Sequence, residues 1–88
     1  MRWLADVQVV PREDIADPAG LAITDGLRQL GHASVQAVHV GKLLQVEFEA
    51  PDESAAERMV GAMCRQLLAN PVIEDASWEI RAAGGPRR

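Results

Sequence analysis

The sequence predicts a small α+β domain whose elements follow one another in the order β-α-β-β-α-β. Three observations predict this fold class. Residues 3–10 and 43–50 alternate apolar and polar side chains with the period of a β-strand, two other segments repeat apolar residues at helical steps, and residues typical of caps and turns separate them. We therefore expect an antiparallel sheet with both helices on one of its faces, the two-layer ferredoxin-like arrangement.

The first strand and the first helix occupy the beginning of the chain. Residues 3–10 are rich in valine, and Pro11 ends the strand. Asp17 offers a carboxylate N-cap, and Pro18 stands at the first helical position, where its missing N–H is not needed. Apolar residues then recur at helical steps until Gly31 closes the helix.

The middle of the chain predicts a second and a third strand, residues 35–40 and 43–50, joined by a two-residue turn. In the register that this turn gives, Val38, Val40 and Leu43 point away from the helices, although a one-residue bulge would reverse the second strand. Apolar side chains then remain on the uncovered face of the sheet, and such patches usually mark association surfaces. We expect Val38, Val40 and Leu43 in the interface of a homo-oligomer, a dimer or a tetramer; the alternative is scattered exposed valines.

The second helix and the last strand complete the predicted domain. Asp52 or Ser54 can cap this helix, and its apolar stripe continues to Leu67. Asn70 can adopt the left-handed conformation that ends a helix, and the proline that follows forbids continuation. The last strand is expected near residues 76–81.

Length and composition restrict the classes of function. Residues 1–82 form one domain, and residues 83–88 have the composition of a flexible tail. The net charge of −4 argues against nucleic-acid binding. The chain has no apolar run of about 20 residues for a membrane span, and Asp6 interrupts the first apolar residues too early for a signal peptide. With Cys64 as the single cysteine, no internal disulfide can form, and we expect a cytoplasmic protein.

The sequence shows no constellation of residues for catalysis or metal binding. His32 and His39 lie on different elements and are poor candidates for metal ligands. The possible nucleophiles lack a histidine and carboxylate relay in their sequence context; they are Ser34, Ser54, Ser77 and Cys64. We expect no catalytic, cofactor or metal site in this chain, and a buried, inert thiol at position 64.

Four segments match, in order, the pattern of a known family. They are Asp17-Pro18-Ala19-Gly20, residues 27–31, Val38-His39-Val40-Gly41-Lys42, and a Met-Cys-x-x-Leu-Leu-Ala-Asn-x-x-Ile-Glu-Asp run over residues 63–75. Over about residues 5–81 the chain resembles the PurS-type small subunit of phosphoribosylformylglycinamidine synthase.

The resemblance implies a non-catalytic scaffold in purine biosynthesis. The family's reaction converts formylglycinamide ribonucleotide to its amidine. A large synthetase subunit performs the chemistry with ATP and Mg, and a glutaminase subunit releases ammonia. The small subunit, a homo-oligomer, bridges the two so that ammonia passes between their sites. This chain would then bind no cofactor of its own.

The resemblance also indicates which residues contact partner subunits, although each has an ordinary interpretation as a cap, a turn residue or a solvated charge. The expected contacts are Arg12, Lys42, Asn70, Glu74 and Asp75. Two positions depart from the family pattern. Ala19 stands where the family has glutamine, and Ala76 stands where an aromatic residue often follows, so Trp78 becomes the expected anchor.

A regulatory domain that binds small molecules, of the amino-acid-sensing kind, shares the predicted architecture and is the alternative function. Nothing in the sequence singles out a pocket for such a ligand, so the scaffold is the favoured hypothesis.

Overall fold

The computed structural model describes residues 1–83. Its elements are β1 (Arg2–Pro11), α1 (Pro18–Gln29), β2 (Lys42–Glu49), α2 (Glu53–Met63), the π-helical turn η1 (Cys64–Leu68) and β3 (Glu74–Ala82). Of the predicted tail, residues 84–88 lie outside the described residues. Ala83 is described, and its N–H donates to the carbonyl of Arg2 at 2.9 Å.

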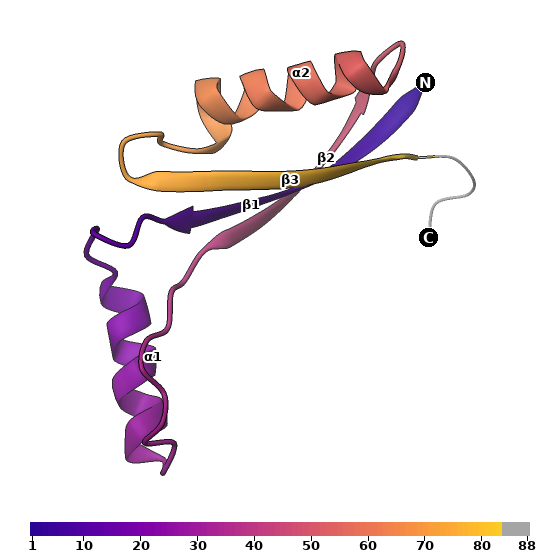
Figure 1. The fold of residues 1–88 in the computed structure, drawn as a ribbon. Coiled ribbons are helices and arrows are strands. Elements are labelled where there is room, and N and C mark those ends of the chain that lie inside the picture. The colour runs from indigo at the N-terminus through magenta and orange to yellow at the C-terminus, as the bar shows by residue number, and fades with distance from the viewer. Residues whose placement is uncertain (84–88) are drawn as a thin grey trace.

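The three strands form an antiparallel sheet in the order β2-β1-β3, with β1 in the centre (Figure 1). The register places Ala5 opposite Val46 on one side and opposite Ile80 on the other. Because side chains alternate along a strand, every second residue of β1 faces the same side of the sheet. The buried set consists of Trp3, Ala5, Val7 and Val9.

Helix α2 covers the face of the sheet on which these side chains lie (Figure 1). Val60 of α2 is fully buried and belongs to one apolar cluster with Val7 and Val9. Asp52 begins the helix, because its Oδ1 accepts the N–H of Ala55 at 2.8 Å. Of the two caps that the sequence allows, the structure uses Asp52.

The end of α2 differs from the prediction. In η1, the N–H of Ala69 donates to the carbonyl of Cys64 at 3.1 Å, which is the wider spacing of a π-helix. Leu67 is 84% exposed while Leu68 packs against the core, so the predicted apolar stripe is wrong at its last residue. No non-glycine residue of the described chain has a positive φ, so the left-handed stop predicted at Asn70 is also wrong.

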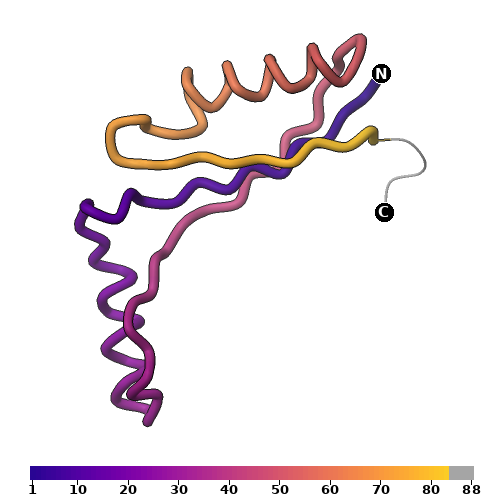
Figure 2. Tube along the Cα trace, in the orientation of Figure 1, coloured from indigo at the N-terminus to yellow at the C-terminus, as the bar shows by residue number. Residues whose placement is uncertain are grey.

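The predicted second strand does not form. Residues 35–41 pair with no strand of the described chain, and they run back along α1 (Figures 1 and 2). The hairpin predicted around this segment is therefore wrong, and α1 packs along residues 35–40 rather than over the sheet. The α+β class and the antiparallel sheet are confirmed, and the order observed is β-α-β-α-β.

The molecule has two parts. The sheet with α2 and η1 is called the body, and α1 with residues 35–41 is called the arm. Figures 1 and 2 show the arm projecting from the end of the body at which β1 ends and β2 begins. Neither helix of the described residues has the length and hydrophobicity to cross a membrane.

Candidate functional site

The arm is held together by side chains of α1 that bind the backbone of residues 35–40. Asp17 accepts the N–H of Gly20 at 3.0 Å, as the predicted N-cap, and its second oxygen accepts the N–H of Val40 at 2.9 Å. Thr24 accepts the N–H of Val38 at 3.0 Å and donates to the carbonyl of Gly20 at 2.8 Å. The N–H of Val40, followed by that of Gly20, holds the pKa of Asp17 below its usual value, because both groups bind the charged form.

One turn further along α1, Arg28 continues this row of contacts. Its Nε donates to the carbonyl of Val35 at 2.8 Å, and its Nη2 donates to that of Gln36 at 3.2 Å. A Cβ at Gly20 would overlap the carbonyl oxygen of Val38, so glycine is needed where the two backbones meet. The α1 side chains therefore take the place of a neighbouring strand, which is the physical reason that residues 35–40 leave the sheet.

The other edge of the same segment is free. Val38 and Val40 direct their N–H groups toward α1, so in an extended chain the residues between and beside them direct theirs to the opposite side. The backbones of Ala37 and His39 make no hydrogen bond with any residue from 1 to 83. Residues 37–39 thus offer an unpaired strand edge, which is a template for another chain.

Apolar side chains of the arm are uncovered. Leu21 is 63% exposed, and Leu30, which belongs to the predicted apolar face of the helix, is 78% exposed. The predicted interface residues are not on one sheet face: Val38 and Val40 lie in the arm, and Leu43 lies on β2. The predicted placement of Val38 and Val40 on the sheet is wrong, because residues 35–40 do not join it. Val40 and Leu43 are exposed and Val38 is half-buried, and their role in an interface remains a prediction.

Four of the five predicted partner contacts gather at one end of the body. Arg12 and Asp75 form an ion pair of 3.4 Å. Glu74 accepts the N–H of Asn70 at 2.8 Å, and the side chain of Asn70 accepts the N–H of Val72 at 3.0 Å, which replaces the predicted helix stop by a turn. Lys42, the fifth predicted contact, lies across the sheet on β2.

Three of these residues line a hollow of about 220 Å³ between β3 and the end of α2, which is called the groove below. Its walls come from the end of β1, from α2 with η1, from the connection that follows and from β3. The lining residues are Arg12, Gly61, Cys64, Arg65, Ala69, Pro71, Glu74, Asp75, Ala76 and Trp78.

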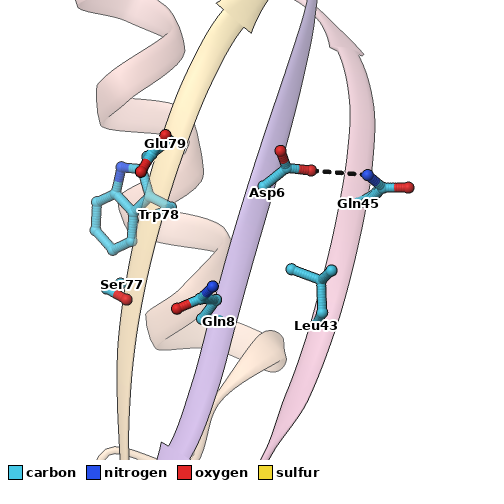
Figure 3. A pocket seen from close by; sticks show the side chains of 7 residues that line it. All are labelled: Asp6, Gln8, Leu43, Gln45, Ser77, Trp78 and Glu79. Carbon is cyan, nitrogen blue, oxygen red and sulfur yellow. Dashed lines mark hydrogen bonds between the residues drawn. The ribbon is translucent and has the colours of Figure 1, made fainter.

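The uncovered face of the sheet carries Leu43, as predicted, but the side chains around it are mainly polar, and the larger apolar patch predicted there is wrong. A hollow of about 290 Å³ on this face is lined mainly by polar side chains (Figure 3). Asp6 accepts from Gln45 at 2.9 Å and from Arg81 at 2.6 Å. The bond from Arg81, followed by that from Gln45, lowers the pKa of Asp6. The prediction failed because it assigned Val38 and Val40 to this face.

The candidate nucleophile and metal ligands are separate from these surfaces. Cys64 is 5% exposed, and burial raises the pKa of its thiol, as expected for an inert cysteine. His39 lies in the arm, with its Nδ1 4.0 Å from Asp17. Within residues 1–83, no group of three or more histidine, cysteine or acidic side chains is placed to hold a metal ion.

Thr24 and Arg28 were not predicted as structural residues of the arm. One signal could have found them. They follow Asp17 by seven and eleven residues, and this spacing places all three on one face of a helix beside Gly20. A row of hydrogen-bonding residues along one helical face indicates that the face binds backbone.

Comparison with known proteins gives matches over nearly the whole chain. The family model PurS, described as phosphoribosylformylglycinamidine (FGAM) synthase, matches residues 4–82. The phosphoribosylformylglycinamidine synthase subunit PurS of Synechocystis sp. is 46% identical over 79 residues, which cover 90% of this chain and 79% of that protein.

Solved structures share the fold as well. PurS of Thermus thermophilus superimposes with a TM-score of 0.83 at 36% identity, covering 96% of this chain and all of that one. A chain of the structure of PurLQS from Thermotoga maritima gives a TM-score of 0.78 at 31% identity, over 92% of this chain and 96% of that one. This chain belongs to the PurS family of phosphoribosylformylglycinamidine synthase subunits.

Proposed function

We propose that this chain is the non-catalytic scaffold of phosphoribosylformylglycinamidine synthase and bridges the ATP-dependent synthetase subunit and the glutaminase subunit for ammonia transfer. The arm is the observation that carries this proposal. It extends away from the body, leaves Leu21 and Leu30 exposed and presents a free strand edge at residues 37–39. A chain with this shape has surfaces for association with other chains. Its likeness to a chain of the structure named PurLQS supports a role as a subunit.

Self-association is part of the same proposal. Residues 37–39 have a free strand edge, and β2 is an edge strand of its own sheet. Pairing of such edges between copies satisfies backbone groups that one chain leaves open and covers the apolar side of α1. We propose a homo-oligomer, a dimer or a tetramer, with Val38, Val40 and Leu43 at or beside the interface.

The oligomer can be tested with one pair of variants. Val40→Lys introduces a charge in the arm, and Val72→Lys introduces the same charge at a position of the body that is 74% exposed. Sedimentation should show Val40→Lys dissociating and Val72→Lys unchanged. An unchanged profile for Val40→Lys would contradict an interface at the arm.

In this proposal, the partner subunits bind the cofactors of the reaction. ATP and Mg belong to the synthetase subunit, glutamine belongs to the glutaminase subunit, and the assembly is cytoplasmic. The contacts predicted for these partners are Arg12, Lys42, Asn70, Glu74 and Asp75. If each of these contacts has a small area, assembly will be transient or ligand-dependent.

Reconstitution tests the scaffold role directly. The synthetase and glutaminase subunits are mixed with and without this chain, and amidine formation is followed with glutamine or with ammonium chloride as nitrogen source. We expect the glutamine-driven reaction to require this chain. The proposal fails if glutamine supports the same rate without the chain while both partners are active.

The alternative, a regulatory domain that binds a small molecule, is favoured only by the hollows of about 220 to 290 Å³. Calorimetric titration of the isolated chain with amino acids and purine nucleotides separates the two functions. A sensor binds one of these ligands tightly without any partner subunit, whereas the scaffold does not.

A further inference from the structure

Strand β3 has a free edge on the opposite side of the sheet from β2. Ile73 accepts the N–H of Arg12, and Ala83 donates to the carbonyl of Arg2, so the odd-numbered residues at both ends of β3 bond to β1. Hydrogen-bonded and non-hydrogen-bonded pairs alternate in an antiparallel ladder. The even-numbered residues therefore direct their N–H and C=O groups outward, where no other strand of residues 1–83 lies. They are Ala76, Trp78 and Ile80.

This edge lacks the features by which proteins usually protect an exposed strand. Strand β3 is nine residues long and contains neither proline nor glycine. Its register with β1 is unbroken from Glu74 to Ala82, so no bulge bends it away from an added strand. Long, regular edges of this kind are templates for pairing with another chain.

The side chains of β3 fit a second copy of β3 in one register. Because the outward bonds must join even-numbered residues, an antiparallel copy near the middle of the strand is centred on Ser77, Trp78 or Glu79. Centred on Trp78, the pairing places Asp75 opposite Arg81 of the second copy, and symmetry repeats this pair. Centred on Ser77 it would oppose Asp75 and Glu79, and centred on Glu79 it would oppose two copies of that acid. Like charges directly opposite each other destabilise a sheet, so charge selects the register about Trp78.

Charges already paired within each chain continue this cross-strand pair. Arg81 donates to Asp6 at 2.6 Å, and Arg12 forms an ion pair of 3.4 Å with Asp75. In the register about Trp78, each row reads Asp6 and Arg81, followed by Asp75 and Arg12 of the second copy. Negative and positive charges alternate along the row, and such a network stabilises more than an isolated surface pair does.

The other face of β3 is apolar in the same register. Ala76 and Trp78, which line the groove, lie opposite Ile80 and Trp78 of the second copy. The indole N–H of Trp78 donates to Glu57 at 3.1 Å, and Figure 3 shows the ring on the side of β3 that faces away from β1. Apolar and aromatic pairs across two strands stabilise antiparallel pairing.

We propose that β3 pairs with β3 of a second copy of this chain, antiparallel and about a two-fold axis at Trp78, so that two sheets join into one. This inference extends the proposed homo-oligomer and rests on it only for the size of the assembly. One interface at the arm and another at β3 give a tetramer, because each chain then contacts two copies. Asp75 is also predicted to contact an enzymatic partner, and in this arrangement it contacts a copy of its own chain.

An exchange of charges tests the register. Asp75→Arg places arginine opposite Arg81 in both rows, and Arg81→Asp places aspartate opposite Asp75, so neither variant should pair with itself. In a mixture of the two variants, each arginine lies opposite an aspartate of the other variant in both rows. Sedimentation should give each variant alone half the mass of the unmodified chain, and the equimolar mixture should recover the full mass.

Glu79→Arg is the matched control for this exchange. It makes the same kind of change at an exposed position on the same strand and face, and it lies opposite Ser77 of the second copy. It should keep the full mass. Full mass for Asp75→Arg and Arg81→Asp alone would overturn the proposal, and so would a mixture that stays at half the mass.

Hydrogen exchange measures the same pairing without a variant. The outward amides of Ala76, Trp78 and Ile80 should gain protection as the concentration of the chain rises, whereas those of Ser77 and Glu79 face β1 and stay protected throughout. Fast exchange of the outward amides at concentrations where the chain has its full mass would overturn the pairing.

These measurements separate this inference from the proposed function. Each charge variant has half the mass of the unmodified chain whether or not the arm also joins copies, so failure of the arm interface leaves the result intact. Reconstitution with the synthetase and glutaminase subunits decides the scaffold role, and a negative result there does not change the mass of the isolated chain.

Discussion

The body and the arm of this protein are stabilised in opposite ways. In the body, Val7, Val9 and Val60 are almost completely removed from solvent, and the sheet and α2 share one apolar core. In the arm, the buried side chain is the polar Thr24, which is 5% exposed, while Leu21 and Leu30 face solvent. Apolar contacts hold the body, and hydrogen bonds from side chains to backbone hold the arm.

The difference in chemistry implies a difference in strength. Burying an aliphatic side chain contributes about 1.5 to 3 kcal/mol, whereas a typical hydrogen bond contributes about 1 kcal/mol net because water competes for its groups. The body therefore supplies most of the stability of an isolated chain, and the arm opens more readily. Stability and association are assigned to different parts of one small domain.

The largest expected effect is on the body. Val60→Ala should lower the free energy of unfolding by about 2 to 3 kcal/mol, because it leaves a cavity at a fully buried position. Met59→Ala is the neighbouring control, and since Met59 is 37% exposed, its loss should stay below about 1 kcal/mol. Urea denaturation measures both. Equal losses would show that the core does not depend on the contact of α2 with the sheet.

A smaller effect is expected from separating the two halves of the arm. Gly20→Ala forces the carbonyl of Val38 away from α1. The amide of Val38 loses its bond to Thr24, worth about 1 kcal/mol, and its exchange should accelerate by about fivefold while core amides of the body do not change.

Gly26→Ala is the control for this change. A Cβ at Gly26 meets nothing within 4 Å, so the substitution should stabilise the helix by up to about 1 kcal/mol. If Gly20→Ala leaves the protection of Val38 intact, the close packing of α1 against residues 35–40 is not what holds the arm.

The smallest effect appears only in acid. The pKa of Asp17 is lowered from its ordinary value of 3.8 by the N–H groups that it binds. The stabilisation that the charged carboxylate gives the arm is therefore complete above pH 3.8, and it is lost as the pH falls through the lower pKa of the folded chain. The Val40 amide should therefore lose protection below about pH 3.8 before the core unfolds. Asp17→Asn removes this titration, and a pH response of Val40 that persists in Asp17→Asn would assign it to another group.

Features set by short-range interactions were predictable from the sequence. Asp17 and Asp52 act as N-caps because a cap needs only a carboxylate and the next backbone N–H groups. Arg12, Glu74 and Asp75 meet because the antiparallel register brings the end of β1 beside the start of β3. Lys42 does not join them, since β1 separates its strand from β3.

Features that depend on the choice of pairing partner were not predictable. Residues 35–40 have the pattern of a strand, and the structure keeps them extended, but the pattern does not say which neighbour takes their backbone hydrogen bonds. Thr24 and Arg28 on α1 take them instead of β2. The open face of the sheet was misjudged for the same reason, because its apolar character was inferred from residues that lie in the arm.

The π-helical turn η1 acts as a one-residue insertion in an otherwise regular helix. Shortening this turn by one residue would rotate everything after Leu68 by the angular step of a helical residue, about 100°. The loop that brings Asn70 to Glu74 would then leave from another side of the helix. The spacing of residues 63–75 therefore fixes the position of the loop as much as the chemistry of its side chains does, and a member of this family that lacked one residue here would present a different surface at the end of its body.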